Sequence, residues 1–316
     1  MPRRGPLDSA RLKPHPPDSA AAPTGENEDP LILGLTTPVS AVAHRPRRRF
    51  AQHWLRDGVV LDRIVEAAGL CRDDVVLEVG PGRGALTQRL LQAGVATVVA
   101  LELDRDLITV LRRRFAPEPR LQLIQGDALA LLRQPLPCPL PRQPNKVVAN
   151  IPYNITGPLL EVLIGGLRNP RDPPFERLVV LLQKEVGDRI TARPGHSDAG
   201  ALSTRMQLLA SCERICDVSP HCFKPAPKVM SEVIRLHPRA LPAALRDPAT
   251  MAMLDRLLGL AYGNRRKMLR SSLSCFPAEQ LRTHASQAGI PLTARPQDLS
   301  LDQWVGLAAA LAPTRS

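Results

Sequence analysis

A predicted strand that runs into a glycine-rich loop and then into a helix constrains the fold of this chain more than any other feature. The β-branched run at 75–79 predicts a buried strand, residues 80–84 a tight loop, and residues 85–92 a helix. Glycines let the backbone approach a ligand closely, and the first turn of a helix offers free N–H groups. The Gly-x-Gly-x-Gly spacing differs from the GxGxxG fingerprint of dinucleotide-binding folds, so the loop predicts a ligand site of another kind.

Predicted strands and helices alternate from residue 59 to residue 182. Such alternation is typical of an α/β fold with a doubly wound parallel sheet, in which ligands bind at the carboxyl ends of the strands. The strands are predicted at 75–79, 97–101, 121–125, 147–149 and 178–182. The helices are predicted at 59–70, 85–92, 107–115 and 159–167. A closing strand is predicted at 232–236, followed by helices only after residue 241.

Acidic side chains stand where several of these strands end. Glu78 precedes the glycine loop by two positions, which suits a ligand with a cationic amino acid group. Glu102 ends the second strand, where an acid can accept both hydroxyls of a ribose. Asp104 is expected to cap the next helix. Asp127 follows the third strand and either accepts from an adenine amino group or caps a helix, and the sequence leaves both roles open.

The stretch Asn150-Ile151-Pro152-Tyr153 follows the fourth strand. An amide oxygen and a backbone carbonyl can accept the two hydrogens of an exocyclic amine, and a tyrosine ring can stack on a flat base. Alone, the tetrapeptide is better explained as a strand end with a surface tyrosine. Its place beside a glycine loop and two acids favours a catalytic role for Asn150, Pro152 and Tyr153. Phe223, at the head of a proline-stiffened segment, is the candidate for the other face of the base.

The net charge of +12 indicates a polyanionic partner, most simply nucleic acid. Two clusters of cations could contact phosphates, although solvated surface charge explains such clusters too. The first cluster holds Arg47, Arg48 and Arg49, and the second holds Arg265, Arg266, Lys267 and Arg270. Because no acid lies within 264–270, phosphate contact is favoured for the second cluster.

Composition also bounds the class of protein. No run approaches the roughly 18 apolar residues that a membrane span needs, so a soluble, cytoplasmic protein is expected. Cys212, Cys216 and Cys222 lie close together beside His221, but without a CxxC pair we expect reduced packing residues and no metal site. Residues 1–44 are predicted to form a disordered tail. The acids in this tail argue against a transit peptide, and a plastid location is the alternative to the cytoplasm.

Taken together, the motifs resemble those of the KsgA-type ribosomal RNA adenine dimethyltransferases, class I methyltransferases that use S-adenosylmethionine. The resemblance runs from about Arg48 to near the C-terminus. It is carried by residues 50–55, 78–82, 102–104, 126–128, 150–154, 182–185, 223–229 and 264–267. It implies a Rossmann-like α/β domain at 45–240 with a mostly parallel seven-stranded sheet. It also implies a small all-α domain at 241–316 that binds rRNA.

The resemblance further implies a reaction and a cofactor site. A monomeric enzyme would dimethylate the N6 amino groups of two adjacent adenines in a hairpin loop near the 3' end of 16S rRNA, within an immature 30S particle. The implied cofactor site consists of His53, Leu55, Gly80, Gly82, Glu102, Asp127 and Asn150. The family's QNFL motif reads Gln52-His53-Trp54-Leu55 here, which makes a side-chain contact from His53 less secure than the others.

Two alternatives come from related proteins with other roles. One is an Erm-type enzyme that dimethylates adenine in 23S rRNA, whose C-terminal domain is less like the segment 265–270. The other is a non-catalytic nucleic-acid binder such as the mitochondrial transcription factor B proteins. Glu102, Asp127 and the stretch 150–153 are intact here, which speaks against lost cofactor binding.

Overall fold

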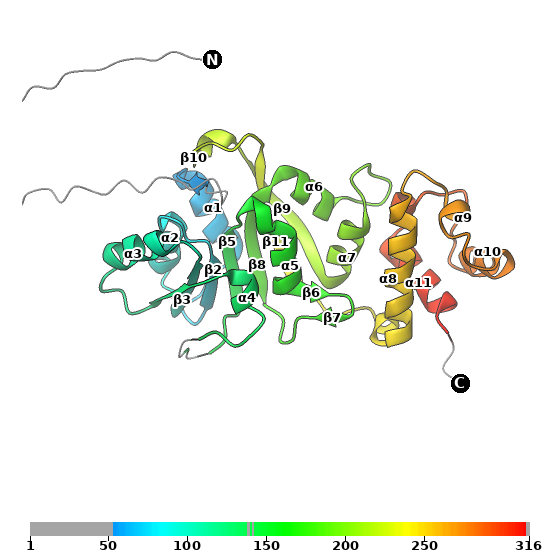
Figure 1. The fold of residues 1–316 in the computed structure, drawn as a ribbon, viewed down its shortest axis with the longest axis horizontal. Coiled ribbons are helices and arrows are strands. Elements are labelled where there is room, and N and C mark those ends of the chain that lie inside the picture. The colour runs from blue at the N-terminus through cyan, green and yellow to red at the C-terminus, as the bar shows by residue number, and fades with distance from the viewer. Residues whose placement is uncertain (1–52, 138–139, 141, 314–316) are drawn as a thin grey trace, which may run out of the picture. The chain divides into compact units, whose positions relative to one another are not determined.

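The computed structural model describes residues 53–137, 140 and 142–313 (Figure 1). The predicted tail at 1–44 and the cations Arg47, Arg48 and Arg49 lie outside the described residues. None of the helices within the described ranges is both long and apolar enough to cross a bilayer.

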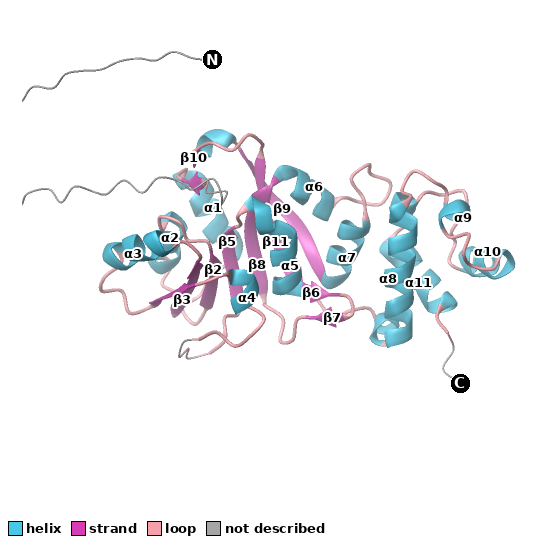
Figure 2. Cartoon of the chain, viewed as in Figure 1, coloured by secondary structure: helices cyan, strands magenta, loops and turns pink. Residues whose placement is uncertain are grey.

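A seven-stranded sheet in the order β4-β3-β2-β5-β8-β11-β9 organises the chain (Figure 2). Its strands are β2 (Val75–Val79), β3 (Thr97–Glu102), β4 (Leu121–Gln125), β5 (Lys146–Asn150), β8 (Arg177–Gln183), β9 (Ala210–Val218) and β11 (Ser231–Pro238). The first five strands of the order pair in parallel, and β11 runs antiparallel to both β8 and β9. The mostly parallel sheet expected from the resemblance is confirmed.

Helices cover both faces of this sheet, as parallel strands require. They are α1 (Gly58–Ala68), α2 (Ala85–Gln92), α3 (Arg105–Arg114), α4 (Ala128–Leu131), α5 (Thr156–Ile164), α6 (Lys184–Thr191) and α7 (Ala201–Leu209). Alternate residues of β2 pack on opposite sides: Val76 joins a core with α1 and α2, and Leu77 joins a core with α5 and α7. The alternation of strand and helix therefore buries two cores with one sheet between them.

Beyond residue 241 the regular elements within the described residues are all helices, joined by turns, as predicted. Its helices, coloured yellow to red in Figure 1, are α8 (Pro248–Gly263), α9 (Leu269–Ser272), α10 (Ala278–Gln287) and α11 (Leu301–Leu311). Asp247 caps α8 and Ser300 caps α11 by accepting from backbone N–H groups. Trp304 of α11 is fully buried and lies 5.9 Å from the ring of Tyr262.

Two sequence predictions of helix are wrong in detail. The helix predicted at 159–167 ends at Ile164, because Gly165 has φ 87° and starts a hairpin of β6 (Gly165–Gly166) and β7 (Asn169–Pro170). The cations at 265–267 lie in a turn between α8 and α9, not within a helix.

A buried ion pair holds the starting ends of β2 and β5 together, at the edge of the sheet where the parallel strands begin. Lys146 Nζ lies 2.7 Å from Asp74 Oδ2, and both side chains are buried. The Asn145 amide and the Cys71 backbone N–H also donate to the Asp74 carboxylate. Burial raises the pKa of Asp74, but these three donors outweigh it and leave the pKa below its ordinary value.

Replacing Lys146 with methionine would leave the buried carboxylate of Asp74 without its cation. We expect Lys146→Met to lower the free energy of unfolding by about 3–5 kcal/mol, measured by urea denaturation. The matched control is Arg89→Met, which breaks an exposed pair with Asp62 and should cost less than about 1 kcal/mol. Similar losses in both variants would contradict a structural role for the buried pair.

Candidate active site

A cavity of about 690 Å³ opens at the carboxyl ends of β2, β3 and β5. This volume lies within the range of roughly 300–1,000 Å³ that is usual for small-molecule sites. Most of its walls come from residues 53–56, 78–83, 101–103, 126–129 and 150–155, and further lining residues include Arg114 and Lys224. The segments that follow the strands predicted at 75–79, 97–101, 121–125 and 147–149 are therefore brought to one place.

The glycine loop forms one wall and packs against an indole ring. Gly80, Gly82 and Gly84 all have positive φ, between 57° and 81°. A Cβ on Gly82 would lie 2.8 Å from Trp54 Cδ1, which only glycine avoids. The Arg83 guanidinium lies over the Trp54 ring, 4.4 Å from its centroid. Trp54 and the loop thus form one packed unit at the cavity.

Glu78 lies at the cavity as a buried carboxyl group that accepts a hydrogen bond of 2.7 Å from the Thr87 hydroxyl. Burial raises the pKa of Glu78 to about 8, and the charge of Glu102 adds to the effect, although Thr87 opposes it. The group is therefore mostly protonated at neutral pH. A cationic group of a ligand beside it would favour the ionised form.

Glu102 is held in place by the backbone on both sides. Its Oε2 accepts from the Gly82 N–H at 3.1 Å, and its Oε1 accepts from the Asp104 N–H at 2.9 Å. Burial raises the pKa of Glu102, and the two N–H donors lower it in part. Each carboxylate oxygen keeps a second lone pair, so Glu102 can still accept hydrogen bonds from a ligand.

Asp104 and Asp127 both cap helices. Asp104 accepts from the Asp106 N–H at the start of α3, which confirms the predicted cap. Asp127 accepts from the Leu129 N–H at 2.9 Å at the start of α4, and its exposed carboxylate also lines the cavity. The cap and a ligand contact are compatible, because a carboxylate offers further lone pairs.

Asn150 ends β5 with its carboxamide in a fixed orientation. The Asn150 amide nitrogen donates to the backbone carbonyl of His53 at 3.2 Å. Because the nitrogen is engaged there, the carboxamide oxygen is the atom left to accept a hydrogen from a ligand. The Pro152 carbonyl accepts from the Ile155 N–H at 3.1 Å and, like any carbonyl, retains a second lone pair.

Tyr153 is restrained by two neighbours, the His53 ring and the Ser231 hydroxyl. Its ring stacks on the His53 ring with the centroids 5.7 Å apart and the planes inclined by 25°. The Tyr153 hydroxyl lies 2.5 Å from the Ser231 hydroxyl oxygen. The His53 ring is itself fixed, because its Nδ1 donates to the Pro225 carbonyl at 2.9 Å. The tyrosine is therefore a positioned side chain and not a freely mobile surface ring.

The structure does not bring Phe223 into the cavity, contrary to the prediction. The strands β1 (Trp54–Leu55) and β10 (Phe223–Lys224) pair antiparallel, with Phe223 opposite Leu55. Phe223 is 5% exposed and packs in the core shared with α1 and α2. Neighbouring strand residues point to opposite faces, so Lys224 lines the cavity in its place.

The second cluster of predicted RNA-binding cations is exposed. Arg266, Lys267 and Arg270 are exposed side chains, and Arg265 donates to the carbonyl of Ser197. Within the described residues, no ion pair joins these four cations to an acid. The surface they occupy is therefore electrostatically suited to an anion.

Several residues of the site were not predicted from the sequence. Trp54 belongs to a motif that was noticed, yet its packing on Gly82 follows only from the fold. Thr87 of α2 contacts Glu78, and Ser231 of β11 contacts Tyr153. A single hydroxyl residue within a helix or strand does not indicate such a contact in the sequence. Arg114 donates to the Arg83 carbonyl at 2.6 Å and adds a cation to the cavity.

Comparison with known proteins gives consistent matches over nearly all of the described chain. The profile of the family described as "Ribosomal RNA adenine dimethylase" matches residues 43–312. A protein of Synechococcus sp. (strain WH7803), named "Ribosomal RNA small subunit methyltransferase A", is 57% identical over 270 residues, covering 85% of this chain and 95% of that protein.

Solved structures give a similar picture. The 23S rRNA methyltransferase ErmE is 27% identical with a TM-score of 0.65, covering 82% of this chain and 99% of that chain. A dimethyladenosine transferase from Plasmodium falciparum, at 24% identity, shares the fold with a TM-score of 0.64, covering 81% of this chain and 96% of that chain.

The contact between Trp54 and the glycine loop can be tested by fluorescence. Gly82→Ala places a methyl group against the indole, so Trp54 must move and its emission should shift to longer wavelength. The only other tryptophan, Trp304, is buried in the C-terminal helices and supplies a constant background. Gly94→Ala is the control: its φ is also positive, at 78°, but nothing lies within 4 Å of the added atom.

The control should lose about 1–2 kcal/mol of stability from backbone strain while its emission spectrum stays unchanged. An unshifted spectrum in a folded Gly82→Ala protein would contradict the packing of Trp54 on the loop.

Proposed function

We propose that this chain, which belongs to the ribosomal RNA adenine dimethylase family, dimethylates the N6 amino groups of two adjacent adenines in small-subunit rRNA. The observation that carries the proposal is the fixed carboxamide of Asn150 at the edge of the cavity. The choice of the small subunit is supported by the relatives named for that activity, which are aligned over nearly their whole length. The proposed target is a hairpin loop near the 3' end of 16S rRNA, since unpaired loop bases are readily splayed out.

The cavity suits S-adenosylmethionine, which supplies an electrophilic methyl group when bound. The polar groups of the cavity fit the three parts of S-adenosylmethionine: Glu78 the amino acid portion, Glu102 the ribose hydroxyls and Asp127 the adenine. The positive φ of Gly80 and Gly82 leaves room for close approach to the backbone. We assign cofactor binding to His53, Leu55, Gly80, Gly82, Glu102, Asp127 and Asn150.

The residues at the end of β5 would activate the target amine. The lone pair of an adenine N6 is delocalised into the ring, which makes the amine a poor nucleophile. The Asn150 carboxamide oxygen and the Pro152 carbonyl accept its two hydrogens and favour a more tetrahedral, more nucleophilic nitrogen. Tyr153 stacks on the extruded base and holds it in line for transfer. The methylated nitrogen then loses its proton readily, so no strong general base is required.

The two alternatives have less support. The 23S rRNA methyltransferase ErmE shares the fold at 27% identity, well below the 57% of the small-subunit relative. A purely nucleic-acid-binding role leaves the fixed Asn150 and the cavity around Glu102 without a use. The finer proposals are that the substrate is rRNA within an immature 30S particle, and that the enzyme is a cytoplasmic monomer.

The substrate assignment is tested with labelled S-adenosylmethionine. The protein is incubated with immature 30S particles, with 50S particles and with free rRNA, and labelled dimethyladenine is located by nuclease mapping. We expect label in small-subunit rRNA of the 30S particle. Label confined to large-subunit rRNA would overturn the assignment, and RNA binding without any label would favour the non-catalytic alternative.

Asn150→Ala should separate catalysis from binding. Losing one preorganised acceptor of the amine should lower the methylation rate by about 10²–10³-fold while the affinity for rRNA changes little. The measurements are single-turnover rates and filter binding. Asn169→Ala, an exposed asparagine of β7, is the control and should match the wild type in both assays. Equal losses of rate and affinity in Asn150→Ala would mean that Asn150 is structural.

Arg266→Ala tests the exposed cations of the C-terminal segment. If Arg266 contacts a phosphate, the variant should bind rRNA more weakly, and the slope of log affinity against log salt should fall by about 1. Arg282→Ala is the matched control, because Arg282 already forms an ion pair with Glu279. An Arg266→Ala slope identical to that of the wild type would count against a phosphate contact there.

A further inference from the structure

The Tyr153 hydroxyl contacts a residue from a distant and rigid part of the chain. Its partner, Ser231, is 0% exposed and begins β11, seventy-eight residues further along the sequence. Ser231 pairs with Gln183 of β8 on one side and with Val218 of β9 on the other. The hydroxyl that contacts Tyr153 therefore belongs to an inner strand of the sheet and not to a loop.

Ser231 and His53 restrain different torsions of Tyr153. The phenolic oxygen lies on the axis of the Cβ–Cγ bond, so a hydrogen bond to it fixes the direction of that axis and hence χ1. Rotation of the ring about the axis, χ2, is intrinsically soft in tyrosine. The stacking of the His53 ring restrains this second rotation. Together the two contacts determine where the face of Tyr153 lies.

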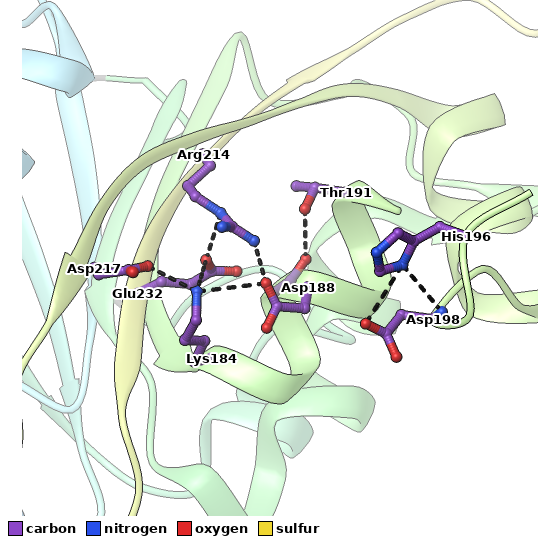
Figure 3. A network of polar contacts seen from close by, with 9 residues as sticks. Lys184, Asp188, Thr191, His196, Asp198, Arg214, Asp217 and Glu232 are labelled. Carbon is purple, nitrogen blue, oxygen red and sulfur yellow. Dashed lines mark hydrogen bonds and ion pairs between the residues drawn. The ribbon is translucent and has the colours of Figure 1, made fainter. Parts of the chain in front are cut away.

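A polar network next to Ser231 fixes the start of β11 (Figure 3). Glu232, the following residue, is 0% exposed, and its carboxylate lies 2.8 Å from Arg214 Nε of β9 and 3.9 Å from Lys184 Nζ of α6. Burial raises the pKa of Glu232 to about 7 although Arg214 opposes the shift. Arg214 also pairs with Asp188, and Lys184 pairs with Asp217 at 2.9 Å.

The Glu232 carboxylate packs directly against the backbone of α6. A Cβ on Gly187 of α6 would lie 1.5 Å from the Glu232 carboxylate, so glycine is needed at that position. The network joins α6, β9 and β11 immediately beside Ser231. Its cations are Lys184, which belongs to the 182–185 motif, and Arg214 of β9. The network therefore connects that motif to the strand that begins at Ser231.

We propose that Ser231 is a positioning residue for methyl transfer, acting through the hydroxyl of Tyr153. The inference rests on the proposed function, in which Tyr153 stacks on the target base beside Asn150. Without the Ser231 hydroxyl the tyrosine axis is free to tilt, the base loses its alignment with the Asn150 oxygen, and a smaller fraction of bound complexes reacts. The effect therefore falls on the rate of the bound complex and spares affinity.

A double-mutant cycle tests this coupling. Ser231→Ala and Tyr153→Phe remove the same hydrogen bond from opposite ends, and Tyr153→Phe leaves β11 unaltered. Each should lower kcat about tenfold with little change in the KM for 30S particles. The double variant should lose no more than either single one, because the shared contact is already gone. Ser231→Thr, which keeps a hydroxyl, should restore most of the rate.

Fluorine NMR reports the same contact without any substrate. The chain contains two tyrosines, so 3-fluorotyrosine labelling gives two sets of signals, which Tyr262→Phe assigns. Ser231→Ala should shift and broaden the Tyr153 signal and leave the Tyr262 signal in place. Ser203→Ala is the matched control, since Ser203 is a buried serine that bonds only with Gly200 among the hydrogen bonds of the described residues. It should change neither signal nor kcat.

The outcomes distinguish this inference from the proposed function. Additive losses in the cycle, or an unchanged Tyr153 signal in Ser231→Ala, would overturn the positioning role while methylation by the wild type stands. A wild-type protein that fails to methylate any rRNA would overturn the proposed function and the positioning role with it. If Ser231→Ala does not fold, the comparison of Tyr153→Phe with the wild type still decides: an unchanged kcat contradicts the proposal.

Discussion

The pairing of β5 between β2 and β8 is the interaction on which the rest of the site depends. In this register Leu77 lies beside Val147, and Asn150 lies beside Leu181. The turn after β5 is therefore adjacent to the glycine loop on one side and to the end of β8 on the other. Because the three strands are parallel, their carboxyl ends share one edge, and the polar groups that follow them converge there.

Residues 53–56, before α1, form one wall of the cavity at the edge of the sheet. The short pairing of β1 with β10 joins residues about 170 positions apart and sets the His53 carbonyl opposite the Asn150 amide. That single hydrogen bond decides which end of the carboxamide faces the cavity. An acceptor at this position can take a hydrogen from an amine, whereas an N–H donor cannot. The contact between these distant chain segments is therefore what makes Asn150 an acceptor toward the cavity.

Local sequence patterns predicted most of the secondary structure and the order of the site residues. Residues 85–92 form the predicted helix, and Asp104 caps the following one, because both depend on neighbours within a few positions. The prediction failed where a single glycine controls the backbone, as at Gly165. It also failed for the cations at 265–267, where a run of good helix formers lies in a turn between two packed helices.

Local patterns were enough to predict which chemical groups stand at the strand ends, because strand, loop and helix follow from local periodicity and the parallel order follows from their alternation. How those groups are held depends on contacts between distant parts of the chain. Phe223 was predicted at the head of an extended, proline-stiffened segment, but its burial depends on the face that pairing with β1 turns inward. Ser231 gave no signal, since its contact with Tyr153 arises from the packing of β11 beside β8, and no local pattern encodes a bond across 78 residues.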